Sequence, residues 1–437
     1  MKQFIQYKQD QKEFNKMVKD IANLCAIPSI SVESKDKKYP FGKEVNDALD
    51  YVLNLAKSFG FDTFKDKNNQ YGYAQIGKGK KSIGILAHLD VVPEGDKGQW
   101  KTEAFKPVIE EDKIIARGSL DDKGPTIINL YAMKYIYDNK LLSDEWNIRI
   151  IFGLSEETTM NSMKAYLKEN EPPYLSYTPD GEWPLIFAEK TIYHTEISFP
   201  KIDNLEIEGG LVANQIPDIV NLVYKNKKET IKGIGGHGST PEKGENAIIK
   251  AIKKLVNDDP TLITKDLFKF VLTNFMTNNY ELKNIFSGFE DFSGKLSANL
   301  GIIKTLKDRY VTSFDLRVPV SLKKEDIQKY LNDYLQKTFK GRVTENLVGY
   351  KNSKYMPKDN EMLRVLMLTY NEAMKTNEEP LAIGGGTYAR LLENCVAFGS
   401  TKYMHLMHGP NEYFSYQEIK DSLEIYINAL VRLQDIK

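Results

Sequence analysis

The stretch KSIGILAHLDVVP, from Lys81 to Pro93, decides how the rest of the chain is interpreted. Its apolar residues up to Leu86 predict a short buried strand that ends at a histidine. His88 and Asp90 are two positions apart, so on a strand their side chains point to the same face. This pattern is typical of a metal site in which the histidine binds the ion and the carboxylate holds the ring in one tautomer. Because such a pair also arises by chance, the interpretation depends on partners elsewhere in the chain.

The composition is that of an ordinary soluble globular protein. The chain has 437 residues, of which 41% are hydrophobic and 27% charged, and this length usually forms about two to four domains. Lys+Arg and Asp+Glu are both 60, so the net charge is zero. This balance does not favour a polyanionic partner, and no basic stripe indicates nucleic acid.

The cysteines and the N-terminal sequence favour a reducing compartment. Cys25 and Cys395 lie in apolar surroundings without a C-x-x-C partner, so both are predicted to be buried free thiols. The opening residues MKQFIQYKQDQKEF lack the apolar core of a signal peptide. The sequence has no run of about 18 apolar residues, which a membrane span needs. We therefore expect a cytoplasmic protein that does not bind membranes.

Strands and helices alternate through the first part of the chain. Apolar residues at helical spacing predict helices over about residues 10–25 and 43–59, and a third helix that has Pro125 in its first turn. Strands are predicted over about residues 71–76, 82–86 and 146–152, with a hairpin between Trp100 and Arg117. The alternation predicts an α/β catalytic domain with a doubly wound mixed sheet.

Acidic residues stand where the predicted strands end. Asp121 and Asp122 lie in RGSLDDKGP, Glu156 and Glu157 lie in LSEET, and Asp180 lies in LSYTPDG. Ligands of open α/β sheets bind at the carboxyl ends of the strands. A helix N-cap would account for one residue of the Asp pair, and turn chemistry for Asp180. Packing does not account for two adjacent glutamates after a buried strand.

From about Phe187 the pattern changes to repeated antiparallel strands. This change predicts an inserted α+β lid domain over residues 187–355. The catalytic domain then consists of the two flanking segments, residues 1–186 and 356–437. The loop GIGGHGSTPEKGENA, Gly233–Ala247, holds His237 in surroundings more flexible than a core histidine usually has. Arg317 lies on a predicted strand, where an ion pair is its ordinary role. The predicted lid strands are Ile192–Phe199, Leu205–Val212, Ile219–Tyr224, Leu296–Ile303 and Arg309–Val318, and its helices include Ala247–Leu255 and Ile327–Tyr334.

The C-terminal part returns to the α/β pattern. Gly384–Gly386 indicates close approach of the backbone to a ligand, but it lacks the strand and spacing of a dinucleotide loop. His408 precedes the last predicted helix, whereas we interpret His194 and His405 as structural.

The loop residues together can form a two-metal site, whose ligands are His88, Asp121, Glu157, Asp180 and His408. If Asp121 bridges, each ion receives one histidine, one terminal carboxylate and the bridge, which leaves room for water. Glu156 is then the best candidate for the general base.

Seven motifs occur in the order HLDVVP, GSLDDKGP, SEET, PDGEWP, GGHGSTPEKGENA, GGGTYAR and HGPNE. Together they resemble the M20 family of metallopeptidases, and most closely its PepV/Sapep-type dipeptidase branch. The resemblance covers about Leu86 to Glu412 and implies the same metal ligands, with Asp121 bridging and a cis peptide after it. It implies that Asp90 orients His88 and that Glu156 is the base. It further implies that His237 stabilises the oxyanion and that substrate is contacted by Asn214, Arg317, Gly385, Gly386 and Thr387.

The function that this resemblance implies is a metal-dependent dipeptidase that hydrolyses small unblocked dipeptides with two divalent ions, which are zinc, manganese or cobalt. It also implies a lid of duplicated ferredoxin-like halves and a monomer in which His237 acts within its own chain. One alternative is an amidohydrolase of the same family that acts on N-acyl amino acids, such as an aminoacylase or desuccinylase. Another is a non-catalytic metal-binding protein, against which the intact Glu156 argues.

Overall fold

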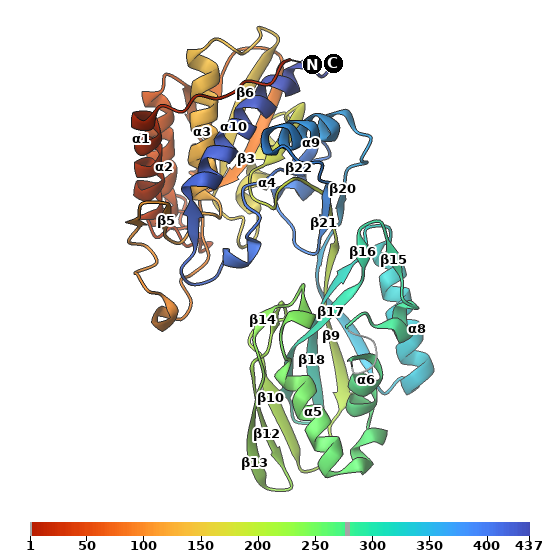
Figure 1. Cartoon of the computed structure of the whole chain (residues 1–437). Coiled ribbons are helices and arrows are strands. Elements are labelled where there is room, and N and C mark those ends of the chain that lie inside the picture. Colours follow the sequence, from red (N-terminus) through yellow and green to blue (C-terminus); the bar gives the residue numbers. More distant parts are fainter. Residues whose placement is uncertain (1, 276–279) are drawn as a thin grey trace. The chain divides into compact units, whose positions relative to one another are not determined.

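The computed structural model describes residues 2–275 and 280–437, which divide into two compact units (Figure 1). Unit 1 comprises residues 2–187, 356–381 and 387–437. Unit 2 comprises the described residues of Ala188–Tyr355 together with Ala382–Gly386. Within the described ranges, no helix combines the length and the apolar character that crossing a membrane requires.

The largest sheet has parallel strands at its centre and antiparallel strands toward its edges, and its strands up to residue 187 and at residues 395–397 belong to unit 1. β3 (Lys81–His88) lies between β6 (Trp146–Gly153) and β7 (Leu175–Thr178) and runs parallel to both. The strand order is β1 (Asp62–Lys65), β2 (Gly72–Ile76), β6, β3, β7, β22 (Cys395–Ala397), β8 (Ile186–Glu189) and β20 (Lys354–Tyr355), and β21 (Leu381–Ile383) pairs with β8. This arrangement confirms the predicted α/β class with a mixed sheet.

Helices cover the two faces of this sheet because successive strand residues point to opposite sides. On one face, α4 (Asn161–Glu169) and the short 3₁₀ helix η4 (Tyr388–Leu391) pack on Leu86 and Ile151. On the other face lies α3 (Lys123–Asp138), most of whose residues are buried. The remaining helices are α1 (Gln11–Cys25), α2 (Lys43–Ser58), α9 (Glu361–Met374) and α10 (Tyr416–Arg432).

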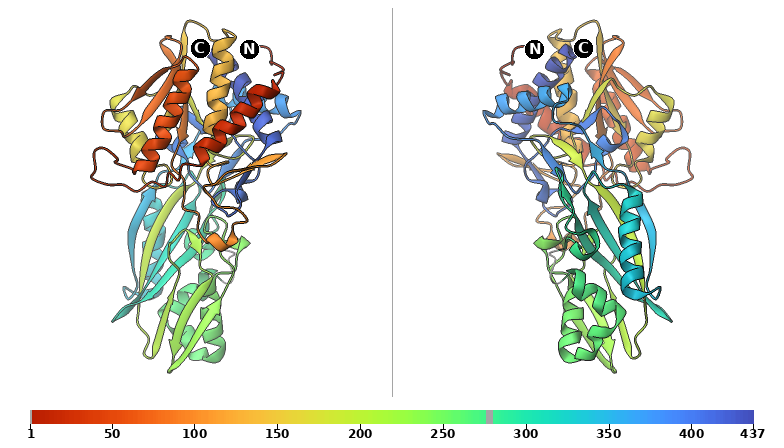
Figure 2. Two further views of the ribbon diagram at one scale, coloured as in Figure 1. Left: turned by 90° about the vertical axis from the view of Figure 1, so that its left-hand side faces the viewer. Right: turned by 90° about the vertical axis from the view of Figure 1, so that its right-hand side faces the viewer.

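Local sequence signals explain where the terminal helices begin. Asp10 caps α1 by accepting from the N–H of Glu13 at 2.8 Å, and Ser415 caps α10 by accepting from the N–H of Glu418 at 3.2 Å. The segments next to both chain ends lie side by side, since Nζ of Lys2 donates to Oε1 of Gln434 at 3.2 Å (Figure 2). A small separate sheet contains β4 (Val108–Ile109), β5 (Lys113–Ile115) and β23 (Tyr413–Ser415).

Unit 2 is built on one continuous antiparallel sheet. Its helices α5 (Ala247–Asp258), α6 (Asp266–Phe275) and α8 (Lys324–Phe339) pack on that sheet through an apolar core. The strand order is β13 (Lys227–Lys232), β12 (Ile219–Tyr224), β10 (Leu205–Gly209), β17 (Ser297–Thr305), β18 (Arg309–Val318), β9 (Thr191–Pro200) and β19 (Thr344–Lys351). Short elements are α7 (Lys283–Phe286), β11 (Gln215–Ile216), β14 (Gly236–His237), β15 (Glu290–Asp291) and β16 (Gly294–Lys295). The duplication of this unit into ferredoxin-like halves stays a prediction.

One strand of unit 2 is shorter than its sequence predicts. The expected strand over 205–212 ends at Gly209. Gly210 follows with φ 79°, a left-handed conformation, and a Cβ there would lie 1.8 Å from the carbonyl oxygen of Gly301. Only glycine therefore fits this position, and the chain leaves the sheet there.

Candidate metal centre

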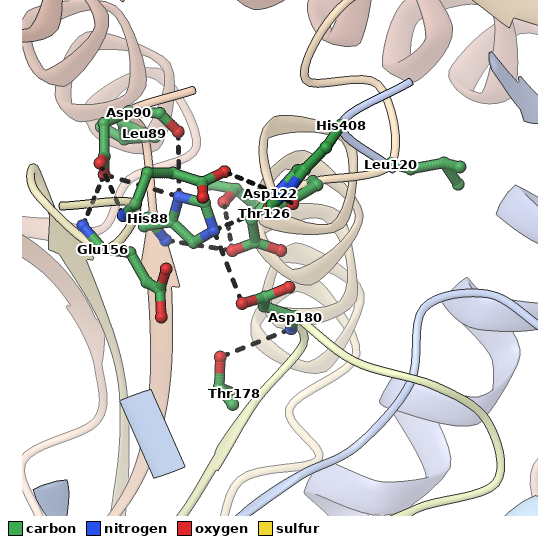
Figure 3. Close-up of polar contacts among 12 residues, drawn as sticks. His88, Leu89, Asp90, Leu120, Asp122, Thr126, Glu156, Thr178, Asp180 and His408 are labelled. Atoms are coloured by element: carbon green, nitrogen blue, oxygen red, sulfur yellow. Dashed lines mark hydrogen bonds and ion pairs between the residues drawn. The ribbon is translucent and has the colours of Figure 1, made fainter. Parts of the chain in front are cut away.

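His88 is the last residue of β3 and is completely buried. Its Nδ1 atom lies 3.0 Å from the backbone carbonyl oxygen of Asp90 and 3.5 Å from Oδ1 of the Asp90 side chain. Its backbone N–H donates to Oδ2 of Asp122 at 3.0 Å. These contacts direct the other ring nitrogen, Nε2, toward the carboxylates of Asp121 and Asp180, at 2.9 and 3.7 Å (Figure 3).

In the described part of the chain, two groups of side chains have the geometry to hold a metal ion, and they share Asp121. The first is His88, Asp121 and Asp180. The second is Asp121, Glu157 and His408, with Nε2 of His408 2.8 Å from Asp121 and 3.2 Å from Glu157. Oδ1 of Asp121 faces one histidine and Oδ2 faces the other, which is the arrangement of a bridging carboxylate. The peptide bond Asp121–Asp122 is cis, as the family resemblance predicts.

The polar atoms of this cluster fit a bound cation. Among the described residues, Oε1 of Glu156 is buried without a hydrogen-bond partner, whereas Nε2 of His88, Oδ1 of Asp121 and Oε1 of Glu157 are buried and contact charged groups of the cluster itself. Buried polar atoms normally have such a partner, because leaving them without one costs free energy. Imidazole nitrogens and carboxylate oxygens are the donors that divalent transition metals accept. The cluster therefore has the composition of a metal centre.

Burial disfavours the charged forms of the acidic residues in the cluster and so shifts their pKa values upward unless nearby histidines oppose it. Burial and the nearby charge of Asp121 raise the pKa of Glu157 to about 7, and burial also raises the pKa of Asp180. Burial raises the pKa of Glu156 well above its usual value, and the nearby negative charge of Asp180 raises it further. For Asp121 burial acts in the same direction, but hydrogen bonds from His408 and His88 lower its pKa overall.

Asp90 connects the end of β3 to the turn that carries the two glutamates. Its Oδ1 and Oδ2 atoms accept hydrogen bonds from the backbone N–H groups of Glu156 and Glu157, at 3.0 and 3.1 Å (Figure 3). This contact fixes the turn that follows β6. Glu156 is buried beside the cluster but belongs to neither group of metal ligands.

The candidate substrate residues lie mainly in unit 2. Nδ1 of His237 lies 2.6 Å from Oγ of Ser239, and the carbonyl oxygen of Asn214 accepts from the N–H of Gly238 at 2.7 Å. Arg317 is nearly buried and forms an ion pair with Asp315 at 2.8 Å, and it also donates to the carbonyl oxygen of Gly384 at 2.5 Å. Gly385 and Gly386 belong to unit 2, whereas Thr387 belongs to unit 1 and caps η4.

Sequence reasoning gave no role to several buried residues around the cluster. The rings of Tyr388 and His88 pack edge to face, with ring centres 6.2 Å apart. Arg117 and Glu412 form a completely buried ion pair of 2.7 Å, and Asp122 holds the backbone of His88. Glu412 and Tyr388 belong to quoted motifs, HGPNE and GGGTYAR, but a motif does not say which distant residue its members contact.

Comparison with known families gives a match over nearly the whole chain. The model of peptidase family M20/M25/M40 matches residues 84–433. A protein of Staphylococcus epidermidis named "Putative dipeptidase" is 32% identical, with 96% of this chain and 97% of that protein covered. A protein of the same description from Staphylococcus aureus strain MRSA252 is 29% identical over the same shares.

Solved structures share the fold at low sequence identity. Human carnosine dipeptidase 1 gives a TM-score of 0.62 at 12% identity, covering 97% of both chains. Bacillus subtilis YXEP, described as a dinuclear metal binding peptidase from the M20 family, gives a TM-score of 0.56 at 11% identity and covers 98% of this chain and 99% of its own.

Proposed function

The chain belongs to peptidase family M20/M25/M40, and we propose that it is a metal-dependent dipeptidase that hydrolyses small unblocked dipeptides. The observation that carries the proposal is the pair of histidine–carboxylate groups that share Asp121, with the buried carboxylate of Glu156 beside them. The relatives that bear the name of a dipeptidase support the choice of substrate class.

Two divalent ions would be held by one histidine and one terminal carboxylate each, and by Asp121 between them. His88 and Asp180 would hold one ion, and Glu157 and His408 the other. Mixed imidazole and carboxylate donors suit zinc, manganese and cobalt. When bound, such ions supply a water nucleophile at neutral pH and polarise the carbonyl of the substrate.

Glu156 is proposed to accept the proton of the attacking water and to pass it to the leaving amine. Asp90 supports this step indirectly, because its carboxylate binds the backbone N–H of Glu156. Unit 2 is proposed to supply His237 for the oxyanion, and Asn214 and Arg317 for substrate, together with the backbone around Gly385, Gly386 and Thr387.

The test is an activity panel on protein that has been stripped with a chelator. Unblocked dipeptides such as Ala-dipeptides and β-Ala-His are compared with N-acetyl amino acids, before and after Mn²⁺, Zn²⁺ or Co²⁺ is restored. We expect metal-dependent release of free amino acids from the dipeptides. Faster hydrolysis of the N-acetyl substrates would assign the protein to an aminoacylase-like activity. Metal binding without any hydrolysis would leave a non-catalytic role.

We further propose a cytoplasmic monomer in which His237 acts within its own chain. Cys25 and Cys395 are buried thiols that are not joined in a disulfide, which fits a reducing compartment. Gel filtration with light scattering tests the oligomeric state, and an obligate dimer would contradict this part of the proposal.

A further inference from the structure

We propose that the buried pair Arg117 and Glu412 is a positioning device that holds the shared ligand Asp121 and the ligand His408 in place for the second metal ion. This inference rests on the proposed two-metal function. Neither residue is a candidate ligand. Both are almost completely inaccessible, and Nη1 of Arg117 lies 2.7 Å from Oε2 of Glu412.

Glu412 holds the backbone that carries the bridging ligand. Its other carboxylate oxygen, Oε1, accepts from the N–H of Leu120 at 2.8 Å and from the N–H of Asp121 at 3.4 Å. Its own carbonyl oxygen accepts from the N–H of Ala116 at 3.0 Å. One residue of the C-terminal segment therefore fixes the loop on which Asp121 is placed.

Arg117 holds the other ligand. Its Nη2 atom donates to the carbonyl oxygen of His408 at 3.1 Å and to that of Pro93 at 3.3 Å. His408 has φ 60°, a left-handed conformation that a residue with a side chain keeps only when its surroundings impose it. The guanidinium group supplies such a constraint, since its planar fork can bind a carboxylate and carbonyl oxygens at the same time.

The ion pair thus joins two ligands that are far apart in sequence. Asp121 and His408 both belong to the second group of candidate ligands, together with Glu157. The first group contains Asp121 but not His408. Loss of the ion pair should therefore weaken the second site more than the first. Residues that orient metal ligands typically change metal affinity by about 10–100-fold when they are replaced.

The experiment is a calorimetric titration of metal-free protein with Mn²⁺, combined with thermal unfolding of the same samples. Glu412→Gln keeps an oxygen that can accept from Leu120 but removes the negative charge opposite Arg117. We expect wild type to bind two ions and this variant to bind the second about 10–100-fold more weakly. Glu372→Gln is the matched control. It removes the carboxylate that forms an ion pair of 2.7 Å with Arg432 elsewhere in unit 1, and this pair has no contact with the cluster.

A double variant separates positioning from simple stability. Glu412→Gln leaves Arg117 as an unpaired buried charge, which destabilises the fold by itself. Combining Arg117→Met with Glu412→Gln removes both charges, so the melting temperature should recover toward wild type while the second Mn²⁺ site stays weak. If metal affinity recovers together with stability, the pair is only structural and the inference is wrong.

The outcomes also distinguish this inference from the function on which it rests. If wild type binds two Mn²⁺ ions and folded Glu412→Gln binds both with wild-type affinity, only the positioning inference fails. If wild type does not bind two ions, the two-metal proposal fails and the inference fails with it.

Discussion

Asp90 accepts a hydrogen bond of 3.0 Å from the backbone N–H of Glu156, which links the strand end that carries His88 to the turn that carries the candidate base. A second bond, from the N–H of Glu157 at 3.1 Å, uses the other oxygen of the same carboxylate. Because both oxygens of Asp90 accept from backbone N–H groups of the turn, Asp90 positions Glu156 through its backbone.

Replacing Glu156 with glutamine should abolish catalysis without removing metal. The amide cannot accept the proton of water, and losing a general base typically costs about 10²–10⁴-fold in rate. The measurement is kcat on an unblocked dipeptide, together with the metal content of the purified variant. Glu145→Gln is the control, since this exposed residue precedes β6 at the opposite end of the same strand. Activity of Glu156→Gln within tenfold of wild type would remove this residue from the mechanism.

Metal binding should strengthen as the pH rises through about 7. In the metal-free protein the pKa of Glu157 is raised to about 7, so below that pH this ligand carries a proton that the metal must displace. Burial lowers the pKa of His408, but Glu157 and Asp121 raise it well above its usual value, which acts in the same direction. Titrations in two buffers of different ionisation enthalpy measure the protons released. A Mn²⁺ affinity that is independent of pH between 6 and 8 would contradict the assignment.

Gly153→Ala should damage the site through packing. Gly153 is the register partner of His88, and a Cβ there would lie 2.1 Å from the hydroxyl oxygen of the buried Tyr388. Overpacking of this kind costs about 1–3 kcal/mol of unfolding free energy. Because the Tyr388 ring faces His88, we also expect weaker metal binding.

Denaturant titration and Mn²⁺ calorimetry measure the two effects of Gly153→Ala. Gly235→Ala is the matched control, since its Cβ would meet no atom closer than 3.6 Å. Wild-type stability of Gly153→Ala would mean that the Tyr388 ring can move aside.

Cys25 should resist alkylation in the folded protein. Burial raises the pKa of its thiol to about 12, so the reactive thiolate does not form between pH 7 and 9. Reaction with iodoacetamide should therefore stay slow across this range, and Cys25 and Cys395 should both react after unfolding. Mass spectrometry of the labelled peptides provides the measurement. Rapid labelling of native Cys25 at pH 8 would show that this part of α1 opens.

The candidate ligands could be proposed from the sequence because each lies in a short motif at the end of a strand or before a helix. His88, Asp121, Glu157, Asp180 and His408 were proposed as one set, and the structure brings them together around Asp121. The parallel strands at the centre of the sheet also follow from local patterns, since apolar runs separated by helices form β-α-β units.

The supporting contacts could not be predicted in the same way. Arg117 and Glu412 are 295 residues apart, and each has an ordinary local explanation as a surface charge. Tyr388 is an aromatic residue in a glycine-rich motif, which does not indicate that its ring faces His88. These contacts depend on how the C-terminal segment returns to the first half of unit 1, and hydrophobic periodicity carries no information about that return.

The link between the units has a consequence for modularity. Lys354 of β20 is the register partner of Glu189 of β8. The segment of residues 190–353 therefore begins and ends at neighbouring positions of two paired strands. A segment with adjacent ends can be deleted or exchanged as a cassette, because a two-residue hairpin turn can close the gap. The candidate metal ligands all belong to the part that remains. Under the proposed function, the side chains that contact substrate can therefore be exchanged in unit 2 while the candidate metal ligands are kept.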